Sequence, residues 1–416
     1  MARPLLASTS LALSWMFSPD ALTMLANSFG QKGSMFFGSF VIGAIVSVLA
    51  ISLIHHPTAT TSGSSFRDLA TETGLLPAMT LTLSSRLCLV VLLPTGMLVT
   101  AGFTFNETFI YWFPNFGFSF LLLGLVLALH LTGDHVALAA QSVFIGVTIS
   151  CLVLLCFAGL FSSQEFQPTP DEQWSTSSVI PLVFTALLLF LGYDRLDSSL
   201  LSDGRRYYTW AIGAGCILLT FWGFVSLKNV PSQILADSTI PNVISARTIL
   251  GQPGRIFMGI IVISGTCGIV NSLFLHASQS LRQMADHVFL PSTGGPAIRR
   301  IFCAICFSLA IGAFMAAGLA GSDNLETFIY GTLLLWLLMI GANCFSAVRR
   351  LQRQRGTACF SWYLLSAVFP VAAVWLAFIY VHAITLVVFC FLVLAVSATF
   401  SAGWLWYDRK IRNKLP

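Results

Sequence analysis

Two acidic residues stand in interrupted, otherwise apolar stretches of the sequence. Asp20 lies in WMFSPDALTML and Asp194 in LLLFLGYDRLDSS, and aligning the two stretches gives a shared D-x-L core at an offset of 174 residues. A carboxylate at membrane depth costs several kcal/mol unless it meets a cation, a proton or a water-filled cavity. Helix-breaking residues beside both acids free backbone groups, which hydrocarbon tolerates only where they line a cavity or a ligand. The two stretches therefore predict one polar site between two broken helices.

The residues around the two acids are the candidates for substrate binding. Asp20 either pairs with a substrate ammonium, a Na⁺ or a coupling proton, or belongs with Ser18 to a cap of the following half-helix. Asp194 stands beside Arg195, so a gate salt bridge and a substrate contact are both open. The predicted substrate-binding set is Ser18, Asp20, Ala21, Phe190, Gly192 and Tyr193.

Three further polar residues lie within apolar runs. Arg86, in LTLSSRLCLVV, must find a carboxylate or backbone carbonyls if it is buried, which predicts a gate or salt-bridge role like that of Asp194 and Arg195. Asn271 and Ser272 either coordinate Na⁺ near the first broken span or form hydrogen bonds between helices. The sequence therefore assigns ion or proton coupling to Asp20, Asn271 and Ser272.

The composition limits the class of protein. The chain has 416 residues, of which 9% are charged and 56% are hydrophobic, and its mean hydropathy is +0.84. Soluble domains carry roughly 25% charged residues, so a soluble enzyme is nearly excluded. A net charge of +5 makes no basic surface for nucleic acid.

Chemical signatures are few. The C-x-x-C pair, Cys303 and Cys306, follows an apolar helix pattern with no second pair, which favours packing over metal binding. No nucleophile–base or phosphate-binding motif occurs. We therefore expect no enzymatic activity, and no cofactor beyond a coupling Na⁺ or H⁺.

Apolar runs bounded by Pro, Gly and charge clusters predict an all-α, polytopic membrane protein of about 12 spans. The spans lie near 5–30, 34–54, 75–103, 115–132, 134–160, 177–199, 206–227, 254–285, 298–320, 323–348, 359–379 and 382–407. Most Lys and Arg residues fall in alternate loops, which predicts that both termini are cytoplasmic, in a plasma or bacterial inner membrane.

The spans also predict an internal repeat. Residues 1–160 and 177–350 would form two five-span repeats, the second inverted in the membrane, and residues 357–416 would hold two final spans and a cytoplasmic tail. Interrupted helices at matching places in two inverted repeats are typical of the central site of a secondary transporter.

Three motifs resemble those of the amino acid–polyamine–organocation (APC) transporters. The family's run A-S-R-x-L-y-a-M-A-r-d-g-x-L-P is similar to HASQSLRQMADHVFLPSTGGPAIRR, with matches at Ala277, Ser278, Leu281, Met284, Ala285, Leu290 and Pro291. The run FLGYDRLDSSLLSDGRRYYTWAI matches at Gly192, Tyr193 and Asp194, and LTGDHVALAAQSVFIGVTI has the family's glycine at Gly133. The resemblance implies a leucine-transporter-like 5+5 inverted-repeat fold, with an extracellular cap in residues 228–254.

Two positions depart from the APC pattern. Ser18-Pro19-Asp20 stands where that family has a Gly-Ser-Gly-like stretch whose amides hold a substrate carboxylate, so one amide is lost and a negative charge is added. The fifth span has no Lys, although many proton-coupled relatives carry one near the place of Thr148. The first departure favours a cationic or carboxylate-poor substrate, and the second argues against proton coupling through a lysine.

The sequence thus predicts an amino acid permease-like secondary transporter. It would move a small amino acid or amine by alternating access, coupled to H⁺ or Na⁺ or by exchange. A carrier of inorganic ions or another non-amine solute on the same fold is also open, as is a non-transporting membrane sensor or assembly subunit. The predicted partners are the amine substrate and the lipid bilayer, without nucleic acid, and the oligomeric state is open.

Overall fold

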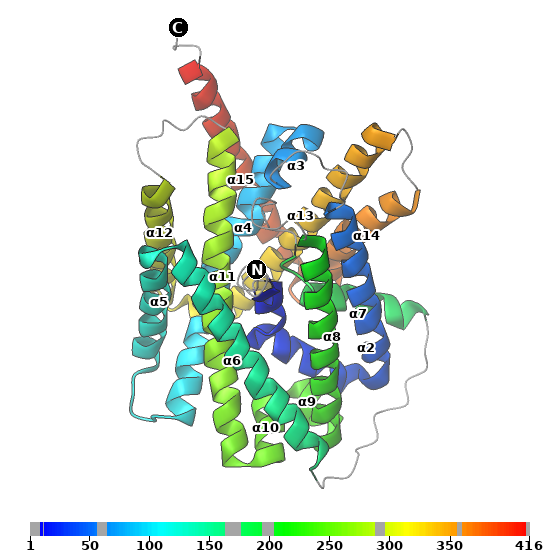
Figure 1. Ribbon diagram of the computed structural model, residues 1–416, viewed down its shortest axis with the longest axis vertical. Helices are drawn as coiled ribbons and strands as arrows, with labels where there is room; N and C mark the ends of the chain where they lie inside the picture. Colours follow the sequence, from blue (N-terminus) through cyan, green and yellow to red (C-terminus); the bar gives the residue numbers. More distant parts are fainter. Residues whose placement is uncertain are drawn as a thin grey trace. The chain divides into compact units, whose positions relative to one another are not determined.

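The computed structural model describes residues 9–10, 12–55, 65–162, 176–193, 204–287, 296–355 and 360–412, and these contain helices but no strand (Figure 1). A short helical stretch over 12–16 precedes the first labelled helix. The helices are α2 (Pro19–Ile54), α3 (Ser65–Thr73), α4 (Leu75–Thr108), α5 (Asn115–Thr132), α6 (Asp134–Leu160), α7 (Thr176–Leu189), α8 (Gly204–Asn229), α9 (Ser232–Asp237), α10 (Pro241–Leu250), α11 (Gln252–His287), α12 (Pro296–Ala316), η1 (Leu319–Gly321), α13 (Asp323–Arg355), α14 (Phe360–Ile379) and α15 (Ala383–Arg412). A helix satisfies its own backbone polar groups, as a bilayer requires.

The first two predicted spans are joined in one helix. Residues 5–30 and 34–54 were expected as separate spans, but α2 runs from Pro19 to Ile54 across a kink at Gly33, which has φ 48° and ψ −125°. This φ lies in the left-handed region that glycine adopts without a steric penalty. The predicted boundary at residues 31–33 therefore coincides with this kink, where one glycine with non-helical φ and ψ separates two helical segments without a longer loop.

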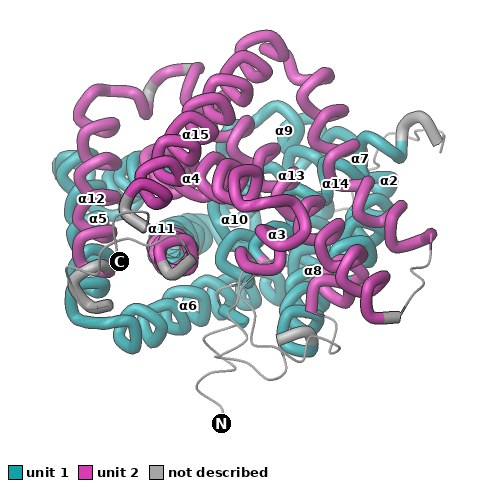
Figure 2. Tube along the Cα trace, turned by 90° about the horizontal axis from the view of Figure 1, so that it is seen from above, with its two compact units in different colours: residues 1–48, 97–192, 206–272 teal, residues 49–96, 193–205, 273–416 magenta. Residues whose placement is uncertain are grey.

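The helices form two compact units, each built from discontinuous segments (Figure 2). Unit 1 comprises residues 1–48, 97–192 and 206–272, and unit 2 comprises residues 49–96, 193–205 and 273–416. These units are defined by contacts and the predicted repeats by internal similarity, so the division at 1–160, 177–350 and 357–416 stays a prediction.

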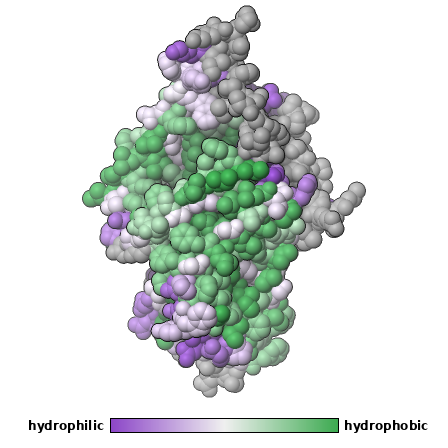
Figure 3. All heavy atoms as spheres, turned by 90° about the vertical axis from the view of Figure 1, so that its left-hand side faces the viewer, coloured by the Kyte–Doolittle hydropathy of each residue, from purple (hydrophilic) through white to green (hydrophobic). Residues whose placement is uncertain are grey.

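Nine of the described helices are long and apolar enough to cross a membrane, which confirms a polytopic membrane protein. Two shorter apolar helices, Val179–Leu189 and Arg300–Ala316, lie within the sixth and ninth predicted spans, and the first of them ends ten residues before its predicted span, 177–199, does. Apolar residues cover a broad continuous area of the face in Figure 3, as expected for a surface in contact with lipid. The helix α15 is the extreme case, since only 11% of its most apolar window is buried.

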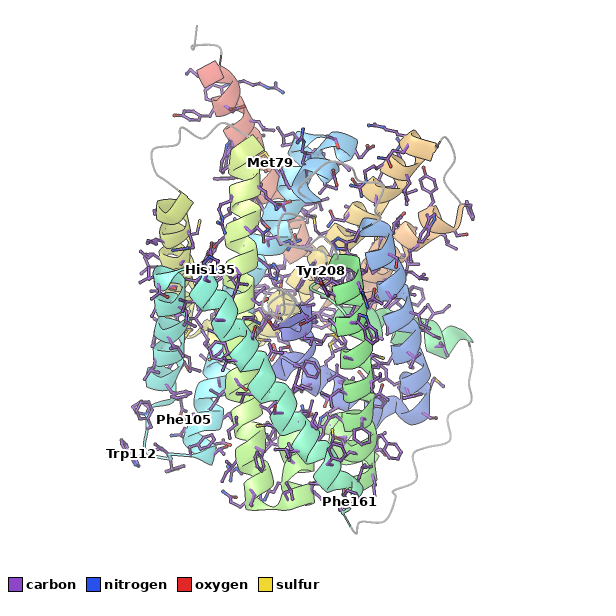
Figure 4. The ribbon with its side chains drawn as sticks, in the orientation of Figure 1. Met79, Phe105, Trp112, His135, Phe161 and Tyr208 are labelled. Atoms are coloured by element: carbon purple, nitrogen blue, oxygen red, sulfur yellow. The ribbon has the colours of Figure 1, made fainter. Side chains whose placement is uncertain are left out.

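Aromatic side chains gather where α4 ends. Phe105 stacks on Phe118 with ring centroids 3.8 Å apart, and Phe113 meets both rings edge-on. Trp112 lies beside them and is 81% exposed (Figure 4). Exposed aromatic rings at the end of a spanning helix are typical of the membrane–water interface.

In unit 2, α13 packs on α14, α15 and the short helix α3. The helix α3 contributes Phe66 and Leu69 to a buried apolar cluster that includes Met339 of α13. Two ion pairs join the same helices: Arg350 pairs with Asp68, and Arg353 Nη1 lies 3.1 Å from Glu72 Oε1. Arg350 and Arg353 of α13 therefore attach α3 to this helix.

Candidate functional site

The first broken span is interrupted at Phe17 and Ser18. The stretch over 12–16 ends with Phe17 N donating to Leu13 O (3.1 Å), and a new helix starts at Pro19. Ser18 caps this helix, because its hydroxyl accepts from Ala21 N (3.3 Å) and its carbonyl accepts from Leu22 N (3.0 Å). Serine at the cap and proline at the first helical position are the preferred residues for such a start.

Asp20 lies in the first turn of α2, directly after this break. Its neighbours Ser18 and Ala21 are fully buried, at 0% and 1% exposed, and Asp20 itself is half-buried. Helix N-termini carry partial positive charge, which stabilises a carboxylate there. The break therefore places an acid, a hydroxyl and irregular backbone within four consecutive residues.

The second broken span is interrupted after α7. Phe190 N donates to Leu187 O (3.2 Å), Gly192 has φ 104°, and the residues from Phe190 to Tyr193 are buried. A φ of this sign is unfavourable for residues with a side chain, so Gly192 is where the helix can end. The predicted gate residues Asp194 and Arg195 lie outside the described residues.

Within unit 1, the two breaks are joined directly. Trp15 Nε1, from the helical stretch before the first break, donates to Leu188 O in the last turn of α7 (2.6 Å). Phe40 of α2 stacks on Phe190 with centroids 4.7 Å apart. The structure thus brings together the two stretches that the sequence singled out by their polar residues.

The helix α11 lies against the first break. A β-carbon at Gly265 would sit 2.8 Å from the Phe17 carbonyl oxygen and 3.5 Å from Pro19 Cδ. The next residue, Thr266, is fully buried, and its hydroxyl has no hydrogen-bond partner among the described residues. The backbone of α11 therefore closely approaches the interrupted helix at Gly265.

The predicted coupling residue Asn271 joins α11 to α6, which crosses it obliquely in Figure 1. Its side-chain Nδ2 donates to Ala137 O (2.9 Å) and to Gln141 Oε1 (2.8 Å), and Gln141 Nε2 donates to Ser10 O (3.4 Å). Both amide protons thus serve helix–helix bonding, one of the two roles left open by the sequence. Asn271 Oδ1 is buried without a hydrogen-bond partner among the described residues, and Ser272 is 2% exposed.

Two other predicted site residues, Arg86 and Tyr193, belong to unit 2. Arg86 is buried in α4 at 6% exposed. Tyr193 is 1% exposed, and its carbonyl oxygen lies 3.4 Å from His55 Nε2.

The connection after α8 folds over the start of α2. Its two short helices, α9 and α10, were not predicted as helices, although prolines at 231 and 241 mark their first turns. Asn242 of α10 accepts from Trp222 Nε1 (2.9 Å) and donates to Thr23 Oγ1 of α2 (3.4 Å). A β-carbon at Gly30 of α2 would lie 2.5 Å from Ala236 N of α9. We call α9 and α10 the cap.

Gly265→Ala tests the contact between α11 and the break. The added methyl would lie 2.8 Å from a backbone oxygen, so we expect a loss of about 1–3 kcal/mol, typical of an overpacked core. Gly146→Ala is the control, because a β-carbon there meets nothing within 4 Å. Thermal unfolding in detergent measures both; equal stabilities of the two variants would contradict the close approach.

The comparisons with known proteins concern the fold. No family model and no curated protein matches the chain. Solved structures of three variants of the manganese transporter of Eremococcus coleocola match it over 97% of this chain and 94% of theirs, with TM-scores of 0.59, 0.58 and 0.58 and identities of 11%, 12% and 11%.

The identification with APC amino acid permeases is therefore wrong, since the structural likeness is to a manganese transporter. The three motifs consist mainly of small and apolar residues with a basic loop, which many packed membrane helices require, so they did not discriminate between families. What the likeness establishes is that the chain shares the polytopic helical fold of these transporter structures.

Proposed function

We propose that the chain is a secondary transporter of an inorganic cation, with its binding site at the broken spans of unit 1. The proposal rests chiefly on one observation. Asp20 lies in the first turn of α2, directly after the break that Ser18 caps, and the backbone of α11 packs against the same break. The likeness to manganese transporter structures over 97% of the chain supports it.

The donor atoms favour a hard divalent cation. The break offers a carboxylate, hydroxyl and carbonyl oxygens, which suit Mg²⁺, Mn²⁺ and Ca²⁺, whereas thiolate and imidazole suit softer metals. Met16, the nearest thioether in the sequence, packs instead against Gly215 of α8. Among the described residues no group of three His, Cys, Asp or Glu side chains could hold a metal. A cation bound here would therefore retain water or backbone ligands, as Mg²⁺ and Mn²⁺ do.

The same geometry is less suited to an amino acid. Pro19 has no amide proton, so the first turn of α2 offers one donor fewer to a substrate carboxylate. Asp20 would also repel that carboxylate. A bare cation avoids both penalties, so it is favoured over the amino acid predicted first. The likeness to manganese transporter structures supports an inorganic cation over an amine.

The cap supplies a mechanism for alternating access. The cap contacts Thr23 and Gly30, in the part of α2 that follows the first break, so the position of the cap is coupled to this part of the helix. In this proposal the site opens to one side when the cap and the start of α2 separate.

Uptake by proteoliposomes tests the proposed function. We expect saturable uptake of Mn²⁺ or Mg²⁺, each competing with the other and neither affected by a mixture of amino acids and amines. Uptake driven by a pH gradient and by a Na⁺ gradient, measured separately, identifies the coupling ion. Saturable uptake of an amine alone would contradict the proposal, and so would the absence of saturable flux of any cation, as expected for a sensor or assembly subunit.

A further inference from the structure

A lysine ammonium lies where two spanning helices of unit 1 end. Lys228 stands in the last turn of α8. Its Nζ donates to three backbone carbonyl oxygens at the end of α6, those of Leu160 (2.6 Å), Ser162 (3.2 Å) and Gly159 (3.5 Å). An ammonium group has three N–H donors and no acceptor, so these bonds use its full capacity. The end of α6 thus surrounds one cation with carbonyl oxygens.

The electrostatics of this place favour a cation whatever group supplies it. The last four carbonyl groups of a helix have no partner within it, and a helix C-terminus carries about half a negative charge. Because the ends of α6 and α8 meet here, about one unit of negative charge converges. Asn229 adds an oxygen, since the residue is 2% exposed and its Oδ1 is buried without a hydrogen-bond partner among the described residues. One positive charge balances the two helix ends.

The same place is the base of the cap. Asn229 Nδ2 donates to Gly159 O (3.2 Å) and to Val225 O (2.8 Å), and α9 begins directly after Pro231. Gly159 has no room for a β-carbon, which would clash with Val225 Cγ1 of α8 and lie 2.9 Å from Ile249 Cδ1 of α10. The end of α6 therefore contacts both the residues that lead into the cap and the second helix of the cap.

We propose that the ends of α6 and α8 form a binding site for a monovalent cation of ammonium size, which Lys228 fills with its own side chain. Because this ligand is covalently attached to α8, it fastens the base of the cap to α6 in any salt solution. Without it, the carbonyl oxygens bind a free ammonium or potassium ion. Lys228 is thus a positioning residue for the cap. Its consequence for transport, a cap base that stays in place while the start of α2 moves, rests on the proposed function.

Hydrogen exchange in Lys228→Met, measured in different chloride salts, tests this site. Methionine keeps much of the aliphatic chain and removes the ammonium, so amides in residues 232–250 should exchange at least about tenfold faster than in the wild type. Ammonium or potassium chloride should restore most of the protection, because backbone carbonyls bind both cations. Tetramethylammonium chloride at the same concentration should not, because this cation is larger and has no N–H donor. Wild-type exchange should be the same in all of these salts.

Two further variants separate this site from a general effect of charge. Lys228→Arg keeps the charge, but a planar guanidinium cannot direct three donors from one atom, so the cap should exchange faster than in the wild type. Lys410→Met is the matched control, because Lys410 also lies near the end of a spanning helix, α15, with its ammonium 5.0 Å from the Trp406 ring centroid. It should leave exchange in the cap unchanged in every salt.

Three results would overturn the proposal. They are unchanged exchange of the cap in Lys228→Met, equal exchange of that variant in ammonium and tetramethylammonium chloride, and wild-type exchange in Lys228→Arg. A Lys228→Met protein that folds in neither salt counts against the proposal in the same way, because ammonium has then failed to replace the side chain. None of these measurements uses cation uptake, so the proposed function can fail while this site stands.

Discussion

Asp20→Asn is expected to abolish cation uptake while leaving the protein folded. Asparagine has nearly the same shape but no charge, so a divalent cation loses its anionic ligand at the first break. We expect the apparent affinity to fall by roughly 100-fold or more, equivalent to about 2.8 kcal/mol. The measurement is initial uptake of Mn²⁺ or Mg²⁺ into proteoliposomes across a range of concentrations, together with thermal unfolding of the same preparation.

The stability of Asp20→Asn distinguishes a residue that binds the cation from a residue that only stabilises the start of α2. The side-chain cap of α2 is made by Ser18, whose hydroxyl accepts from Ala21 N, and Asp20 adds a charge near the helix N-terminus. Such a charge is worth about 0.3–1 kcal/mol. A variant that loses several kcal/mol of stability and keeps uptake would show that Asp20 is structural.

Asp134→Asn is the matched control for this charge. Asp134 also stands in the first turn of a spanning helix, α6, where it follows Gly133. The substitution therefore removes the same interaction with a helix N-terminus at a place away from the break. We expect uptake close to wild type; a loss as large as that of Asp20→Asn would mean that any first-turn acid matters, and would contradict a specific site.

The sequence predicted most helix bounds because local signals mark them. The predicted spans 115–132 and 134–160 coincide with α5 and α6, since Pro114 and Gly133 end the apolar runs on either side. The boundary predicted at residues 31–33 likewise falls at the kink of Gly33, although one glycine between two apolar runs predicts a loop as readily as a kink. Hydropathy indicates which residues prefer an apolar environment over water, but it does not indicate the φ angle of the residue that joins two helices.

The site was predicted in part, and for a similar reason. Polar residues in apolar runs pointed to both breaks, but the bond that joins them, from Trp15 to Leu188 O, connects residues 173 apart. The close approach of Gly265 to Phe17 is equally remote in sequence. Periodicity carries no information about such contacts. One signal in the sequence does bear on this contact: the run Gly265-Thr266-Cys267-Gly268 gives one turn of α11 only small side chains, which allows another backbone to come near.

Gly30→Ala is expected to release the cap from α2. A β-carbon at Gly30 would lie 2.5 Å from Ala236 N, 2.7 Å from Ser232 O and 2.8 Å from Leu235 Cβ, so two backbone atoms of α9 would have to move. Alanine is intrinsically better than glycine inside a helix by about 1 kcal/mol, so any loss must come from this contact. Gly213→Ala in α8 is the control, because a β-carbon there meets nothing within 4 Å and should leave the protein unchanged or slightly stabilised.

Hydrogen exchange in peptides covering residues 232–250 measures the release. In Gly30→Ala the amides of α9 and α10 should exchange at least about tenfold faster, equivalent to about 1.4 kcal/mol of lost protection. Exchange in α5, which packs on α6, should not change. If the cap closes the site during transport, uptake falls in this variant while Mn²⁺ still raises the unfolding temperature, because Asp20 is intact. Unchanged exchange in the cap would contradict the packing of α9 on Gly30, whereas faster exchange with normal uptake would leave the packing in place and remove the cap from the transport mechanism.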